Sequence, residues 1–207
     1  MRNLESDLLI FPEKEDVSTV YSTMIRAITP RPIAWVSTVS PNGKNNLAPF
    51  SYFNGVCSKP AALSISPVNK PDGSTKDTVR NIQANKEFVV NVVPYRLAKE
   101  MVATAAELAY EESEFEVAGL TPVDSQVVAP PCVAQSPIKF ECSMMQIVQV
   151  GEGPFAANLI IGEIKAINVD DSVLDKKGKI DPARVDLIGR MGGRDYCRTT
   201  ERFTCHD

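Results

Sequence analysis

Residues 74–78 read STKDT, which places three hydroxyl groups, one cation and one carboxylate at the predicted start of a helix. The unpaired backbone N–H groups and the positive dipole end of a helix N-terminus attract anions. Lys76 would add a positive charge there, and the hydroxyl groups would add hydrogen-bond donors. Ser74 and Asp77 also match a capping box, so this stretch alone fits either an anion site or an ordinary helix start.

A second group of polar residues surrounds a strand predicted at residues 33–39. Ser37 and Thr38 lie on opposite faces of this strand, because successive side chains alternate. Three further polar residues lie in the adjoining loops: Thr29, Arg31 and Lys70. Together these residues could build a polar pocket with a cationic rim, whereas separately each fits a solvated loop or an exposed strand face.

The segment 46–58, NLAPFSYFNGVCS, combines small and aromatic residues in a way that suits a flat ligand. Pro49 removes a backbone donor and marks an edge strand or a broken strand. Small residues such as Ala48 and Ser51 would let a planar heterocycle approach free backbone groups, and Phe50 could wall it. An aromatic core with an irregular edge has the same composition and is an equal alternative.

Periodicity and turn signals predict the elements that must position these residues. Strands are predicted at 33–39, 61–68, 87–94, 138–150 and 157–169, the last two joined by the Gly-rich turn GEGPF. Helices are predicted at 17–28, 74–85, 95–108 and, briefly, after Asp181. The first helix is expected to bury an apolar stripe: Val17, Val20, Tyr21, Met24, Ile25 and Ile28. Residues 109–137 are proline-rich and are expected to be mostly loop.

Strands joined through turns, with helices between some of them, are typical of an antiparallel β-barrel with peripheral helices rather than a doubly wound α/β sheet. No GxGxxG motif follows a predicted strand, so nothing supports a dinucleotide-binding Rossmann domain. The length of 207 residues suits one domain or one domain with elaborations.

Composition and charge narrow the classes of function. The hydrophobic and charged fractions, 43% and 23%, are those of an ordinary globular protein. A net charge of −4 without a basic run argues against nucleic acid as the main partner, because phosphate neutralisation dominates that attraction. The chain has no long apolar run and no basic, apolar leader, so we expect no membrane span and a cytoplasmic location.

The cysteines do not have the spacing of a metal site. No pair is spaced as CxxC, and the single histidine, His206, follows Cys205. A zinc site of the usual Cys/His type is therefore not predicted, and most cysteines are expected to be reduced thiols packed as small hydrophobic residues. A catalytic Cys205–His206 pair is a weak alternative, because adjacent residues rarely aim their side chains at one another.

Four stretches, taken in order, resemble one known family. They are TPRPIAWVSTVSPNGKNNLAPFSYFNGVCSKPAALSIS at 29–66, STKDTVRNI at 74–82, EFVVNVV at 87–93 and GRMGGRDY at 189–196. Their combination resembles the flavin reductase-like domain family, over about residues 21–203. The resemblance implies the FMN-binding split barrel, which is mostly β with peripheral helices around an antiparallel split β-barrel. It implies a single domain over 1–207, with its core at about 21–170 and a C-terminal tail at 171–207.

The resemblance also assigns roles to residues noted above. Ser37 and Thr38 match positions that contact the ribityl chain or phosphate of FMN, and residues 76–78 match the phosphate-side motif. Residues 48–51, with Asn54, match the segment that lines the isoalloxazine ring. The full set predicted to bind the cofactor is Thr29, Arg31, Ser37, Thr38, Asn46, Ala48, Pro49, Phe50, Ser51, Asn54, Lys70, Lys76, Asp77 and Thr78. The returning half of the first hairpin is accordingly expected to leave a regular strand and border the flavin.

The resemblance implies a homodimer with FMN near the dimer interface, and three functions are consistent with it. The first is an FMN-binding oxidoreductase, a flavin reductase that uses NADH or NADPH and passes electrons to a monooxygenase or another acceptor. A flavoredoxin-like electron carrier and a split-barrel binding protein without redox chemistry are the alternatives. No catalytic side chain is predicted, because hydride transfer to a flavin needs no protein acid or base. The tail around Arg190 and Tyr196 would either close over the flavin or lie on the surface.

Overall fold

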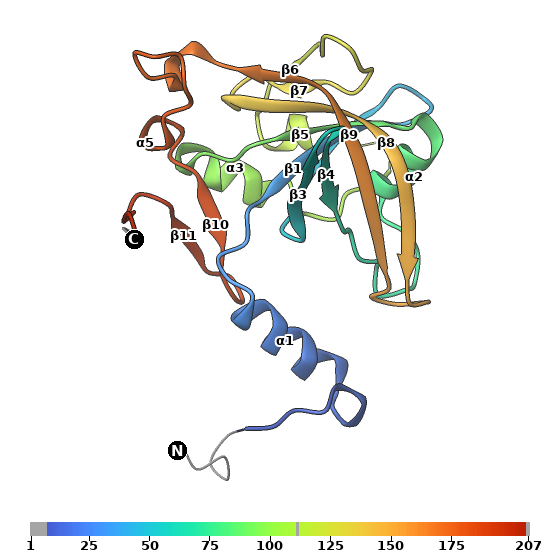
Figure 1. Cartoon of the computed structure of the whole chain (residues 1–207). Coiled ribbons are helices and arrows are strands. Elements are labelled where there is room, and N and C mark those ends of the chain that lie inside the picture. The colour runs from blue at the N-terminus through green and yellow to red at the C-terminus, as the bar shows by residue number, and fades with distance from the viewer. Residues whose placement is uncertain (1–7, 111, 206–207) are drawn as a thin grey trace.

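One antiparallel sheet of seven strands dominates the computed structural model, which describes residues 8–110 and 112–205 (Figure 1). In chain order its strands are β1 (Ala34–Val39), β2 (Asn45–Phe50), β3 (Phe53–Ser58), β4 (Ala61–Ile65), β5 (Glu87–Asn91), β8 (Ile138–Val150) and β9 (Ala157–Val169). Across the sheet they run β2-β1-β5-β8-β9-β4-β3, and every neighbouring pair is antiparallel. The predicted mostly β, antiparallel architecture is therefore confirmed.

Short helices and two small strand pairs surround this sheet (Figure 1). The helices are α1 (Val17–Ala27), α2 (Asp77–Asn85), α3 (Ala98–Ala103), α4 (Glu114–Val117) and α5 (Pro182–Val185), with 3-10 helices η2 (Pro12–Lys14), η3 (Tyr95–Leu97) and η4 (Asp171–Val173). The small pairs are β6 (Pro122–Val123) with β7 (Cys132–Val133), and β10 (Ile188–Arg190) with β11 (Tyr196–Arg198). In the described ranges, no helix is long and apolar enough to cross a bilayer.

The strands of the main sheet curl around one apolar cluster. Strands β1, β4, β5, β8 and β9, together with α2, contribute Ala34, Val36, Leu63, Ile65, Val79, Ile82, Phe88, Val90, Cys142 and Ile160. The β8–β9 pair shifts register after Glu141 and again after Met144, and such bulges bend and twist a sheet. Edge strands β2 and β3 are joined through residues 51–52 and do not pair with each other, so the barrel is split between them.

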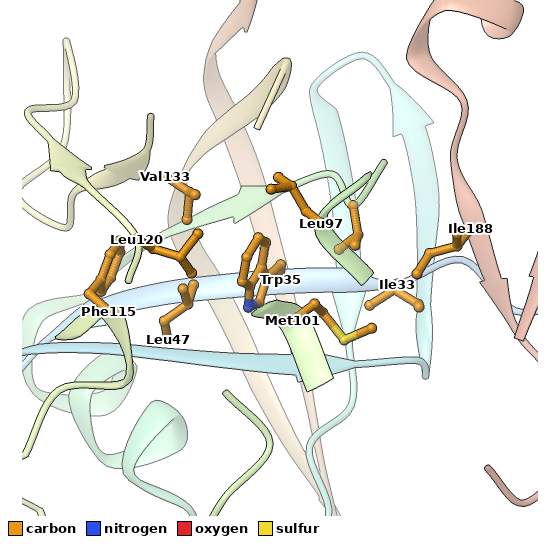
Figure 2. Close-up of a cluster of buried hydrophobic side chains, with 10 residues drawn as sticks. Ile33, Trp35, Leu47, Leu97, Met101, Phe115, Leu120, Val133 and Ile188 are labelled. Carbon is orange, nitrogen blue, oxygen red and sulfur yellow. The ribbon is translucent and has the colours of Figure 1, made fainter. Parts of the chain in front are cut away.

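A second apolar cluster covers the opposite face of β1 (Figure 2). Trp35 is fully buried in it, and its indole Nε1 donates a hydrogen bond of 2.8 Å to the Thr104 hydroxyl. Residues of η3, α3, α4 and β7 pack around this tryptophan. Val36 points into the barrel cluster, whereas Trp35 points into the second cluster on the other face of β1. The alternation predicted for this strand is therefore correct.

Helix α1 forms close to its predicted bounds, but its apolar stripe is not buried as predicted. Val17, Tyr21 and Met24 are 65%, 54% and 44% exposed, whereas Ile25 is buried. Figure 1 shows the helix extending away from the barrel. Periodicity reveals that a helix has an apolar face, but it does not reveal which surface covers that face.

Two other helices are shorter than predicted. Helix α2 begins at Asp77, because the N–H and hydroxyl of Ser74 both donate to the Asp72 carboxylate, at 2.8 and 2.6 Å, in the preceding turn. The predicted capping box is therefore wrong. The helix predicted at 95–108 ends at Ala103, after which the chain continues in turns.

The prediction that the returning half of the hairpin leaves a regular strand is also wrong. Strand β2 pairs with β1 from Val39↔Asn45 to Ala34↔Phe50 without a register shift, and β3 follows directly. Pro49 is tolerated because β2 lies at the edge of the sheet, one of the two placements predicted for it. Pairing with a buried neighbour outweighs the low strand propensity of this segment.

The 109–137 segment and the C-terminal tail are both fastened to the barrel. The buried Glu141 carboxylate accepts hydrogen bonds from the backbone N–H groups of Gln126 and Val127, at 2.9 and 2.7 Å. The backbones of Arg31 and Arg190 exchange two hydrogen bonds, of 2.9 and 2.8 Å. The β10–β11 hairpin therefore lies beside the approach to β1.

Candidate functional site

Two adjoining hollows lie beside the start of α2. The first, which we call the polar pocket, has a volume of about 110 Å³. It is lined by Asn46, Ala48, Pro49, Phe50, Lys70, Lys76, Asp77, Thr78, Thr104, Ala105, Ala106, Glu107, Leu108 and Glu114. The first eight of these are predicted site residues, so strand β2 and the approach to α2 bring most of the predicted set together.

Hydrogen bonds between side chains tie the first turns of α2 to β1 and β2. The Asn46 amide donates to the hydroxyl oxygens of Thr38, at 3.2 Å, and Thr78, at 3.1 Å. The Asn81 amide also donates to Thr38, at 3.0 Å, and its carbonyl oxygen accepts from the Tyr110 hydroxyl at 2.8 Å. Thr38 is therefore a buried anchor beneath the polar pocket, and Thr78 and Asn46 are held on the pocket wall.

The lysines of the polar pocket differ in how they are paired. Lys70 lies 4.0 Å from the Asp77 carboxylate, which also receives Arg80 at 3.2 Å. Arg80 in turn stacks over the Tyr110 ring at 4.0 Å from its centroid. Lys76 forms no ion pair within the part of the chain that the structure describes. Its ammonium group is thus available to an anionic ligand.

Glu114 is a lining residue that no sequence pattern predicted. It is 8% exposed, and its Oε2 accepts the backbone N–H of Leu47 at 2.9 Å. Burial raises the pKa of the Glu114 carboxyl; the Leu47 hydrogen bond opposes this, and the Asp77 charge adds to it. Because Leu47 lies on the edge strand β2, this bond also covers an outward N–H group of the sheet.

The second hollow, which we call the apolar groove, lies between α1 and the barrel and has a volume of about 700 Å³. Helix α1 contributes Val17, Ser18, Val20, Tyr21 and Met24, and the barrel side contributes Tyr52, Val68, Asn69, Pro71, Phe155 and Ala157. Burial and the neighbouring Tyr21 raise the pKa of Tyr52, while the Arg31 charge acts in the opposite direction. Most of the exposed apolar face of α1 is turned toward this groove.

Lys70, Lys76 and Glu107 line both hollows, so the polar pocket and the apolar groove are continuous. The pocket offers a free ammonium group, hydroxyl groups and the start of α2, and these suit an anionic group. The groove has the size and apolar walls of a small-molecule site. Together they suit a ligand with an anionic end and a flat apolar end.

Six predicted residues do not line the polar pocket: Thr29, Arg31, Ser37, Thr38, Ser51 and Asn54. Arg31 is buried, and its guanidinium donates to the backbone oxygens of Ile25, Ile28 and Met191 and to the Ser51 hydroxyl. This cation therefore joins the end of α1 to the tail and to the β2–β3 turn.

Ser37 points to the face of β1 opposite Thr38, where its hydroxyl donates to the Pro131 oxygen. Thr29 bonds the Arg26 oxygen at the end of α1, and Asn54 lies on the exposed strand β3. None of these three residues lines the polar pocket or the apolar groove.

Sequence reasoning missed the segment 104–108, Glu114 and the α1 side of the groove. Residues 104–108 are predicted to be helical, and a helix there would not have been expected to line a pocket with the start of α2. Glu114 lies 67 positions from the Leu47 N–H that it bonds, and no local pattern reports such a contact.

The cysteines contribute nothing to either hollow. All five are free thiols, and burial raises the pKa of both Cys132 and Cys142. Among the described residues, no group of three or more His, Cys, Asp or Glu could hold a metal ion. His206 lies outside these residues, so the Cys205–His206 pair has no structural description.

Comparison with known proteins places these features in a family. Residues 25–184 match the family described as "Flavin reductase like domain". A protein of Aquifex aeolicus is 39% identical over 186 residues, covering 90% of this chain and 93% of that protein. Nitrilotriacetate monooxygenase component B from Bacillus cereus has a similar structure, with a TM-score of 0.91, 34% identity, and coverage of 97% and 99% of the two chains. Pseudomonas fluorescens 2-nitrobenzoate 2-nitroreductase NbaA gives a TM-score of 0.86, 29% identity, and coverage of 97% and 96%.

Proposed function

The chain belongs to the flavin reductase-like domain family, which makes it a flavin-related oxidoreductase, and from this premise we propose that it reduces FMN with NADH or NADPH. The observation that carries the proposal is the continuity of a polar, cationic pocket with a large apolar groove. FMN has the matching shape and chemistry, with a phosphate at one end and a planar ring system at the other.

The polar pocket would hold the phosphate. Lys76 would supply a charge-assisted hydrogen bond, and the first-turn N–H groups of α2 would supply a dipole-oriented anion site. Thr78 faces the same pocket, and its hydroxyl is held by Asn46. A volume of about 110 Å³ suits a phosphate and part of the ribityl chain but not a three-ring system.

The apolar groove would hold the isoalloxazine ring. Its volume of about 700 Å³ exceeds what one flat ring system fills, so a nicotinamide could lie against the ring in the same space. Tyr52 and Tyr21 would pack against the ring. Ala48 and Phe50 would line the passage from the polar pocket. When bound, FMN supplies the hydride chemistry, and the protein supplies binding, orientation and exclusion of water.

We also propose that the chain is one domain and that it acts as a homodimer. Both apolar clusters draw on β1, through Trp35 and Val36, which supports a single folding unit over the barrel and its helices. The exposed edge strand β3, with Val56 51% exposed, supports a dimer. Sedimentation equilibrium tests this, and a monomer at working concentrations would contradict it.

The 34% identity to a protein named as a monooxygenase component supports a monooxygenase as the acceptor of the electrons. Steady-state oxidation of NADH and NADPH, with and without added FMN, tests the proposed reaction. We expect turnover with at least one nucleotide that depends on FMN. If FMN binds but neither nucleotide reduces it, the protein is an electron carrier rather than a reductase.

A further inference from the structure

Glu114 reaches the polar pocket from α4, on a segment far from β2 and α2 in the sequence. Its Oε2 is occupied by the Leu47 N–H, which fixes the side chain in place. A second hydrogen bond to the carboxyl comes from the backbone N–H of Glu114 itself. Both donors are neutral backbone groups, and in the described part of the chain no cation forms an ion pair with Glu114, so an ionised Glu114 keeps its negative charge at the pocket wall.

Glu114 shares the pocket with a nearly balanced set of charges. Two lysines, Lys70 and Lys76, and two other carboxylates, Asp77 and Glu107, line the same hollow. Arg80 reaches it only indirectly, by pairing with Asp77. With Glu114 neutral the lining charges cancel, and with Glu114 ionised they sum to one negative charge.

We propose that Glu114 is an affinity-determining residue of the polar pocket, whose ionisation weakens the hold on a phosphate group. The inference rests on the proposed function, because it takes the FMN phosphate as the occupant. A fixed, largely buried carboxylate that no cation pairs with in the described residues would repel that phosphate. The charge state of Glu114 thus sets how far the attraction between the two lysines and the phosphate is cancelled.

The sign of the pH dependence follows from the environment of the carboxyl. Burial is the main cause that raises the pKa of Glu114, so the group takes up its proton at a higher pH than an exposed glutamate does. Below this pKa the pocket is neutral and favours the phosphate. As the pH rises through it, the pocket gains a negative charge and the phosphate is held less tightly.

The test compares Glu114→Gln with the wild type, because glutamine can still accept the Leu47 hydrogen bond while carrying no charge. Glu116→Gln is the matched control, since Glu116 lies exposed on the same helix and does not line the pocket. FMN and riboflavin, which lacks the phosphate, are titrated by flavin fluorescence at about pH 5 and about pH 8. The unfolding midpoint of each variant checks that the fold is retained.

We expect Glu114→Gln to bind FMN roughly 3- to 10-fold more tightly than the wild type at the higher pH. The advantage should shrink at the lower pH, where the wild-type carboxyl is more fully protonated, and riboflavin affinity should not change. An unchanged FMN affinity, or an equal gain for riboflavin, would overturn the inference while leaving the proposed function intact. If neither protein bound FMN at all, both proposals would fall together.

Discussion

Replacing Lys76 with methionine should weaken FMN binding about 5- to 30-fold and leave riboflavin binding nearly unchanged. Lys76 lines both hollows and forms no ion pair within the described part of the chain. A hydrogen bond to a charged group contributes about 1.5–3 kcal/mol. Lys76 is only partly buried, so we reduce this figure to about 1–2 kcal/mol for solvent screening, which gives the stated range. Methionine keeps a stem of similar length and removes the ammonium group, with its charge and its hydrogen-bond donors.

The assay is a fluorescence titration of each flavin against wild type, Lys76→Met and Lys44→Met. Lys44 is the matched control, because it is an exposed lysine in the β1–β2 turn and lines neither hollow. The FMN effect should also diminish at high salt, as expected for a partly exposed charge. Equal losses for FMN and riboflavin, or no loss for FMN, would refute the placement of the phosphate beside Lys76.

Three further predictions concern the scaffold, each measured as the free energy of unfolding in urea. Thr104→Val leaves the buried indole N–H of Trp35 unpaired and should cost about 1–3 kcal/mol; an unchanged stability would show that this hydrogen bond contributes nothing. Gly162→Ala places a methyl group against the buried ring of Phe88 and should cost about 1–3 kcal/mol, and it would be neutral only if the ring moved freely. Glu141→Gln weakens the hydrogen bonds to the 109–137 segment and should cost roughly 1–3 kcal/mol. The same variant should speed limited proteolysis of that segment, and identical cleavage rates would contradict its anchoring role.

The elements with strong local signals could be predicted from sequence. The β8–β9 hairpin has its predicted bounds, because two long alternating runs flank a Gly-rich turn. Helix α5 starts at Pro182 with the Asp181 side chain accepting the Ala183 N–H, which local capping rules also anticipate. In each case the information lies within a few residues of the element.

The failures share a different cause, which is competition from contacts that local rules do not include. Ser74 could cap a helix, but its N–H and hydroxyl donate to the nearby Asp72 carboxylate instead. Residues 45–50 have poor strand propensity, yet pairing with β1 makes them a strand.

The site shows the same division between local and distant information. The stretch around Lys76 was recognisable by its residue types alone. Glu114 and the α1 wall of the groove depend on the path of the chain, and periodicity does not encode that path. Residue chemistry therefore predicted the lining of the polar pocket better than that of the apolar groove.

The central claim is that the polar pocket and the apolar groove together hold FMN. The measurement that tests it most directly is a crystal structure of the protein with bound FMN. Our account predicts the phosphate within hydrogen-bond distance of Lys76 and of the first-turn N–H groups of α2, with the ring in the groove beside Tyr52. A phosphate bound elsewhere, or a ring outside the groove, would contradict it.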